Sequence, residues 1–187
     1  KRAQALGLIS QHFYTIAIAG THGKTTTSIM LAHILKQANV DCTAFMGGIS
    51  QNYNTNFLLS NENNYMVVEA DEYDRSFLYL NPNIAIITSL DSDHLDIYGN
   101  YDELISSFKK FASQVKDDGC LIIEESISEH FSSPKRGELY TYSNSEKSDY
   151  YFKDVTQKIN KVEFSFCRKN LNFENNKKLN NVVLSMP

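Results

Sequence analysis

Apolar residues in the first two-thirds of the chain fall into short runs that alternate with longer amphipathic stretches. Four brief runs rich in Ile, Val and Ala are typical of buried strands: 14–19, 65–70, 84–88 and 120–123. Segments 25–37 and 101–115 instead carry apolar residues at helical spacing. Because strands that alternate with helices form parallel βαβ units, we expect a doubly wound, mostly parallel α/β sheet over residues 14–137.

The pattern changes from residue 138 onward. Short runs of alternating apolar and polar residues occupy 139–142, 150–155, 162–166 and 182–186. Polar segments rich in Asn, Lys and Ser, such as 170–181, separate some of them. This pattern predicts a small antiparallel β-sheet over residues 138–187, attached to the α/β core.

Composition excludes several classes of protein. The formal net charge of -4 gives no reason to expect a nucleic acid or an anionic membrane as a partner. No apolar run approaches the roughly 18–20 residues that a membrane-spanning helix needs. Cys42, Cys120 and Cys167 are far apart and odd in number, which favours reduced thiols in a cytoplasmic protein. The chain opens on Lys1 without a start methionine and ends on a strand-like run at Pro187, so we interpret it as an excised domain.

The most specific local signal is the segment Gly-Thr-His-Gly-Lys-Thr-Thr-Thr at 20–27, between a predicted strand and a predicted helix. Glycines let the backbone turn tightly, and a helix N-terminus attracts anions, so this context predicts a phosphate loop. In such a loop Lys24 reaches the β- and γ-phosphates and the Thr25 hydroxyl binds Mg²⁺. The general pattern has a further glycine where this chain has Ile18. The alternative is a plain glycine turn with Lys24 as a solvated charge.

Three segments resemble the central domain of the Mur ligases, in order and in separation. The loop at 20–27 resembles the family form G-T-[NH]-G-K-T, with the histidine of the L-alanine-adding branch. The segment Glu-Ala-Asp-Glu-Tyr-Asp-Arg-Ser-Phe at 69–77 resembles E-A-D-E-x-D-x-S-F, and 93–99 resembles D-H-[LM]-D-x-[YF]-G. The resemblance covers essentially the whole chain. One departure is Ser89, where many relatives have Asn.

The resemblance implies an ATP- and Mg²⁺-dependent ligase that joins L-alanine to the carboxylate of UDP-N-acetylmuramate through an acyl phosphate. It implies catalytic roles for Lys24 and His22. It also implies that ATP is bound by the loop residues Gly20, Thr21, His22, Gly23, Lys24, Thr25 and Thr26. A UDP-sugar domain is expected before Lys1, and a His-Asn motif and an amino-acid-binding domain after Pro187.

A metal site is expected where strands 65–70 and 84–88 end, because ligands gather at the carboxyl edge of a parallel sheet. The family positions that carry Mg²⁺ match Thr25, Glu69 and His94. Taken singly, Glu69 can instead cap a turn and His94 can be a structural histidine. His22 either contacts the γ-phosphate or acyl group or merely fills the loop. We expect at least one of Asp71, Glu72 and Asp74 to be a solvated acid.

Three other functions are alternatives. The nearest is the ligase that recycles intact tripeptide onto UDP-N-acetylmuramate, and folylpolyglutamate synthase shares the fold. From a different class, a P-loop nucleotide-binding interaction module needs no amino-acid site. The segment at 93–99 argues against that module, as does the lack of an Asn-Lys-x-Asp guanine motif.

Overall fold

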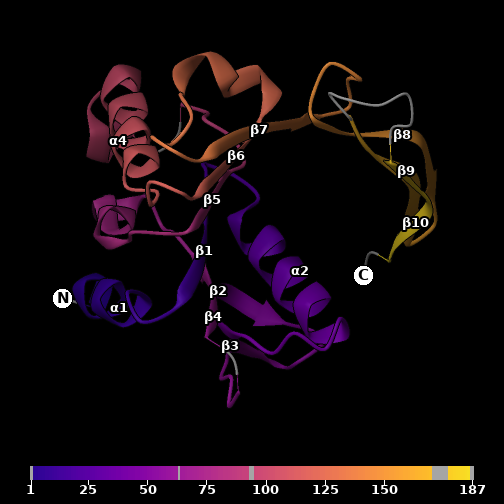
Figure 1. Ribbon diagram of the computed structural model, residues 1–187, viewed down its shortest axis with the longest axis horizontal. Coiled ribbons are helices and arrows are strands. Elements are labelled where there is room, and N and C mark those ends of the chain that lie inside the picture. Colours follow the sequence, from indigo (N-terminus) through magenta and orange to yellow (C-terminus); the bar gives the residue numbers. More distant parts are fainter. Residues whose placement is uncertain (1, 63, 93–94, 170–176, 186–187) are drawn as a thin grey trace.

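The computed structural model describes residues 2–62, 64–92, 95–169 and 177–185. It forms one ten-stranded sheet with helices on both faces (Figure 1). The elements follow in the order α1 (Arg2–Ser10), β1 (Tyr14–Ala19), α2 (Lys24–Gln37), β2 (Thr43–Ser50), β3 (Thr55–Leu58), β4 (Tyr65–Glu69), the 3₁₀ helix η1 (Tyr73–Tyr79), β5 (Ile84–Ile87), α3 (Leu95–Tyr98), α4 (Tyr101–Ser113), β6 (Cys120–Glu124), the 3₁₀ helix η2 (Glu125–His130), β7 (Glu138–Ser143), β8 (Tyr150–Lys158), β9 (Lys161–Arg168) and β10 (Lys177–Ser185).

The strands lie in the order β10-β9-β8-β7-β6-β5-β1-β4-β2-β3. From β7 to β2 every neighbouring pair is parallel, which confirms the predicted α/β class and its mostly parallel sheet. The carboxyl ends of β1, β4 and β5 therefore meet at one edge. In a doubly wound sheet that edge is where ligands bind.

The pairing of β7 corrects one expectation. We expected this strand in the antiparallel sheet, but it runs parallel to β6, and β8 also pairs with it in parallel. Antiparallel pairing in this half begins only between β8, β9 and β10. A short alternating run indicates which face of a strand is buried and not the direction of its partner, which is why the sequence misplaced β7. The division of the chain at residue 137 stays a prediction.

Alternate residues of β1 supply two separate cores. Ile16 and Ile18 face α2, together with apolar residues of β2 and β4. Ala17 and Ala19 face the opposite side, which α4 and η1 cover (Figure 1). This alternation follows from the two-residue period of a strand. Helices on both faces explain why β1 is apolar at consecutive positions.

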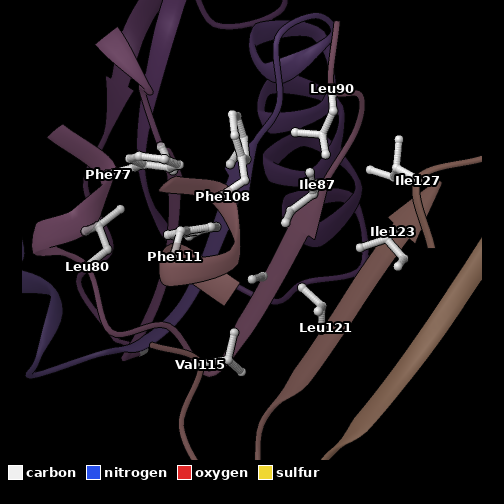
Figure 2. Close-up of a cluster of buried hydrophobic side chains, with 14 of the residues drawn as sticks. Phe77, Leu80, Ile87, Leu90, Phe108, Phe111, Val115, Leu121, Ile123 and Ile127 are labelled. Atoms are coloured by element: carbon white, nitrogen blue, oxygen red, sulfur yellow. The ribbon is translucent and has the colours of Figure 1, made fainter. Parts of the chain in front are cut away.

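The larger core lies under α4. Phe108 and Phe111 of α4 pack against Phe77 of η1, with ring centroids 5.1 and 5.0 Å apart respectively. Figure 2 shows these rings together with Ile87 and Leu121, which belong to strands of the sheet. Phe77 thus anchors η1 in this core, and with it the preceding residues 69–72.

Two features were not expected from the sequence. Helix α1 packs against η1 so closely that a Cβ on Gly7 would lie 2.5 Å from the Tyr79 carbonyl oxygen. The hairpin of β2 and β3 forms one end of the sheet. Within the described ranges, no helix is long and apolar enough to cross a bilayer.

Candidate active site

The loop between β1 and α2 needs its two glycines for different reasons. Gly20 has φ +134°, and a Cβ there would lie 2.1 Å from Thr88 Oγ1 and 2.9 Å from Ser89 N. Gly23 has φ +83°, a left-handed conformation that side chains rarely adopt, although a Cβ there would make only ordinary contacts, 3.8 Å from Thr88 Cβ. Gly20 therefore permits a close approach of two backbones, and Gly23 permits the turn into α2.

The segment after β5 fixes the first half of the loop. Thr21 N donates to Ser89 O at 3.1 Å, and His22 N donates to Ser89 Oγ at 2.9 Å. Thr21 Oγ1 also shares a 2.8 Å hydrogen bond with Ser89 Oγ and accepts from Asp91 N at 2.9 Å. A serine hydroxyl thus holds the first half of the loop in place.

These bonds turn the amides of Thr21 and His22 toward the protein. The first amides of α2, beginning at Lys24, have no acceptor within the helix, as at every helix N-terminus. They carry partial positive charge at the point where the loop ends. The loop can therefore bind an anion through the start of α2, as a phosphate loop does.

The Lys24 side chain folds back onto the start of the loop. Its Nζ donates to the carbonyl oxygen of Gly20 at 2.7 Å and to that of Thr21 at 3.3 Å. It also forms a 2.8 Å ion pair with Glu72 Oε1. Only 13% of the Lys24 side chain is exposed, which contradicts the alternative of a solvated surface charge.

Glu69 ends β4 and faces the first turn of α2. Its Oε1 accepts from Thr25 Oγ1 at 2.9 Å, and its Oε2 accepts from Gly47 N at 2.6 Å and from Ser28 Oγ at 3.4 Å. A Cβ on Gly47 would lie 2.3 Å from Oε1. Gly47 therefore leaves the space in which the carboxylate lies, and the consecutive glycines at 47–48 within a strand are the sequence signal for it.

Two of the three predicted metal ligands thus lie together, whereas His94 is outside the described residues. In the part of the chain that is described, no three His, Cys, Asp or Glu side chains gather as a metal-binding group. The oxygen pair of Thr25 and Glu69 matches the hard donors that Mg²⁺ prefers. That Thr25, Glu69 and His94 together bind Mg²⁺ stays a prediction.

The three acids after Glu69 differ in their surroundings. Asp71 and Asp74 are exposed, and Asp71 Oδ1 accepts from Tyr73 N at 3.0 Å. The expectation that at least one of these acids is solvated is thus confirmed by Asp71 and Asp74, whereas Glu72 is fully buried. Its pairing with Lys24 explains the burial, because buried acids require a charged or hydrogen-bonding partner.

Tyr98 lies beneath this acidic segment and is only 3% exposed. Its hydroxyl donates to the Glu72 carbonyl oxygen at 2.5 Å, and the Arg75 guanidinium lies 5.4 Å from its ring centroid. Burial, followed by the negative charge of Glu72, raises the pKa of Tyr98 to about 12. Tyr98 therefore stays a neutral donor to the main chain of the site.

His22 extends from the loop toward solvent. Its Nε2 lies 3.7 Å from Asp91 Oδ2, and both side chains are more than half exposed. This exposure leaves the ring accessible to a ligand at the loop, and a role of His22 at the γ-phosphate or acyl group stays a prediction.

Two cavities flank the loop. One, of about 380 Å³, lies beside the Glu69 carboxylate and is lined from α1, β2 and η1, with Arg2, Asn56, Asp71 and Ser76 among its polar residues. The other, of about 550 Å³, lies beyond Ser89 and Asp91 and is lined from α4, β6 and η2. The first is lined by Glu69, so it has space for a polar substrate next to this predicted metal ligand.

Comparison with known proteins identifies the family. A family model described as the Mur ligase middle domain matches residues 18–182. The UDP-N-acetylmuramate–L-alanine ligase of Parabacteroides distasonis is 48% identical over 166 residues, which cover 89% of this chain and 36% of that relative. The chain thus spans little more than a third of the relative's length.

Solved structures of similar fold include a tripeptide ligase, UDP-N-acetylmuramate:L-alanyl-gamma-D-glutamyl-meso-diaminopimelate ligase from Neisseria meningitides (TM-score 0.74, 22% identity, 87% of this chain and 55% of that chain). UDP-N-acetylmuramate-alanine ligase MurC from Thermotoga maritima has TM-score 0.72 and 25% identity over 94% of this chain and 39% of its own. The structure of MurF ligase from the same organism, in complex with ADP, has a TM-score of 0.65 and 15% identity. The match covers 89% of this chain and 42% of the MurF chain. The Mur ligase middle-domain model matches most residues of this chain, and the chain therefore belongs to the Mur ligase family.

Proposed function

We propose that this chain is the ATP-binding part of an enzyme that joins L-alanine to the carboxylate of UDP-N-acetylmuramate in peptidoglycan synthesis. The observation that carries the proposal is the placement of Lys24, Thr25 and Glu69 around one phosphate loop. The Parabacteroides relative, named for this activity, is the source of the substrate assignment. The three free cysteines favour a reducing compartment, so we assign the reaction to the cytoplasm.

The residues present fit Mg²⁺. Thr25 and Glu69 supply oxygen donors 2.9 Å apart, and the missing side chain of Gly47 leaves room for the carboxylate. We assign the metal to these two residues and His94. When bound, Mg²⁺ would neutralise charge on the nucleotide phosphates.

The first step of the reaction brings two anions together, the lactyl carboxylate and the triphosphate of ATP. An oxygen of the lactyl carboxylate attacks the γ-phosphorus of ATP and the bond to ADP breaks, which gives an acyl phosphate. The amine of L-alanine then attacks the acyl carbon, phosphate leaves, and the amide forms with release of a proton. The cavity lined by Glu69 offers space for this carboxylate next to a predicted metal ligand.

The residues of the chain act by holding and stabilising charge. The first amides of α2 bind phosphate oxygens, and the Lys24 ammonium stabilises the negative charge of the migrating phosphoryl group. We place His22 beside the transferring group because its ring is accessible at the loop.

A substrate panel on the full-length protein that carries this chain tests the proposal. Phosphate release is measured with ATP, Mg²⁺ and UDP-N-acetylmuramate, with either L-alanine or the tripeptide as the amine, and the product is identified by mass. We expect amide formation with L-alanine. Activity with the tripeptide alone would instead identify the recycling ligase. Nucleotide-dependent capture of a protein partner without an acyl phosphate would identify an interaction module.

A further inference from the structure

Glu72 contacts the loop lysine although the predicted site does not include it. None of its side chain is exposed, and its Oε1 lies 2.8 Å from Lys24 Nζ. The same ammonium donates to the carbonyl oxygens of Gly20 and Thr21. Since an ammonium has three N–H donors, these three protein acceptors account for all of them.

A nucleotide phosphate must therefore replace at least one of these acceptors. Gly20 and Thr21 offer neutral carbonyl oxygens, whereas the bond to Glu72 joins opposite charges away from water. Separating a buried ion pair leaves an uncompensated charge, which costs more than exchanging a neutral acceptor for a phosphate oxygen. The favoured exchange releases the two carbonyls and keeps the bond to Glu72.

The main chain of Glu72 is itself held in place. Its carbonyl oxygen accepts from Tyr98 hydroxyl at 2.5 Å and from Arg75 N at 2.9 Å. Tyr98 is buried, and its segment follows β5, whereas Glu72 follows β4 and Lys24 follows β1. Three segments far apart in the sequence thus determine where the ammonium lies.

On the basis of the proposed function, we propose that Glu72 is a positioning residue that tethers the Lys24 ammonium at the phosphate loop during phosphoryl transfer. Tyr98 orients the main chain that carries this tether. The tether leaves two N–H donors of Lys24 for the β- and γ-phosphates. Its effect is therefore on the transfer step more than on the affinity for nucleotide.

Glu72→Asp and Glu72→Gln in the full-length enzyme test the tether. The aspartate keeps the charge but withdraws the carboxylate by one methylene, and the glutamine keeps the shape but removes the charge. Because misplacing a reacting group by about 1 Å can cost about 10²-fold in rate, we expect kcat to fall by about that factor. The KM for ATP and the melting temperature of the aspartate variant should change far less.

The matched control is Glu146→Gln, which removes the same charge from an exposed pair with Lys153, whose Nζ lies 3.2 Å from Glu146 Oε1. It should leave kcat unchanged. Tyr98→Phe removes only the hydroxyl and should lower kcat in the same direction as Glu72→Asp. A tighter binding of ADP by Glu72→Gln with unchanged kcat would overturn the proposal, because Glu72 would then compete with phosphate. Loss of activity only in proportion to loss of folded protein would also overturn it.

A crystal structure of the chain with Mg²⁺ and a non-hydrolysable ATP analogue separates this inference from the proposed function. The tether requires Lys24 Nζ to remain within hydrogen-bond distance of Glu72 while it contacts a phosphate. A lysine that leaves Glu72 would refute the tether whatever the acceptor substrate is. If the contact persists but the wild-type enzyme ligates neither amine, the proposed function fails and the tether stands.

Discussion

Lys24 combines two tasks. Its charge stabilises the transferring phosphoryl group, and it also compensates the buried carboxylate of Glu72. We expect Lys24→Ala to lower kcat by about 10²-fold or more, since electrostatic groups aimed at the transition state have effects of that size. It should also destabilise the fold by about 3–5 kcal/mol, because it removes the positive charge that pairs with the buried Glu72.

The double variant Lys24→Ala/Glu72→Gln distinguishes the two tasks. It should recover much of the stability in urea denaturation without recovering turnover. Lys153→Ala, which breaks the exposed pair with Glu146, is the control and should change neither measurement appreciably. Turnover of Lys24→Ala close to that of wild type would contradict the role of this lysine.

Gly47 allows a test of the predicted metal site without altering a ligand. The Cβ of Gly47→Ala would lie 2.3 Å from Glu69 Oε1, and the flexible carboxylate must move away. Its bond to Thr25 would then be lost, so the affinity for ADP should fall when Mg²⁺ is present. Calorimetry with and without Mg²⁺ measures this difference. An equal loss under both conditions would show general damage to the loop instead.

Single residues also mark the limit of prediction from the sequence. Glycines, Lys24 and Thr25 between a strand and a helix indicate the phosphate loop, because phosphate binding by such a loop depends on residues that are neighbours in the sequence. The burial of Glu72 was not predicted, because a run of acids is usually solvated and its partner lies 48 positions away. The loop contacts of Ser89 depend on a similar long-range contact.

At the level of elements, strongly periodic segments were predictable and irregular ones were not. Helix α4 has the apolar face and acidic first turn that define its boundaries, and Asn100 Oδ1 caps it by accepting from Glu103 N at 2.9 Å. Helix α1 shows little amphipathic pattern and contains Gly7, because close packing on η1 requires a small residue there. The two glycines of β2 likewise interrupt its strand pattern, and the first of them, Gly47, makes room for Glu69.

The packing of α4 on the sheet makes a prediction at this scale. Phe108 is fully buried between Phe77 and the strands (Figure 2), so Phe108→Ala removes a ring and leaves a cavity. We expect a loss of about 3–5 kcal/mol in the free energy of unfolding, measured by urea denaturation. Phe152→Ala on β8 is the matched control, and its loss should be much smaller because that side chain is 39% exposed. Equal losses would contradict the position of the core.

At the scale of the whole molecule, the phosphate loop and Glu69 lie within a chain that corresponds to 36% of the Parabacteroides relative. Ligation needs three substrates held together, and such positioning can account for roughly 7–11 kcal/mol of the barrier. We therefore expect these 187 residues to bind nucleotide weakly and to form no amide. Since the described contacts of the loop suit phosphates and not a base, ATP and GTP should bind with similar affinity. Calorimetry with both nucleotides measures this affinity, and phosphate release with UDP-N-acetylmuramate and L-alanine measures turnover. Robust alanine-dependent phosphate release by the chain alone would show that the whole catalytic site lies within it.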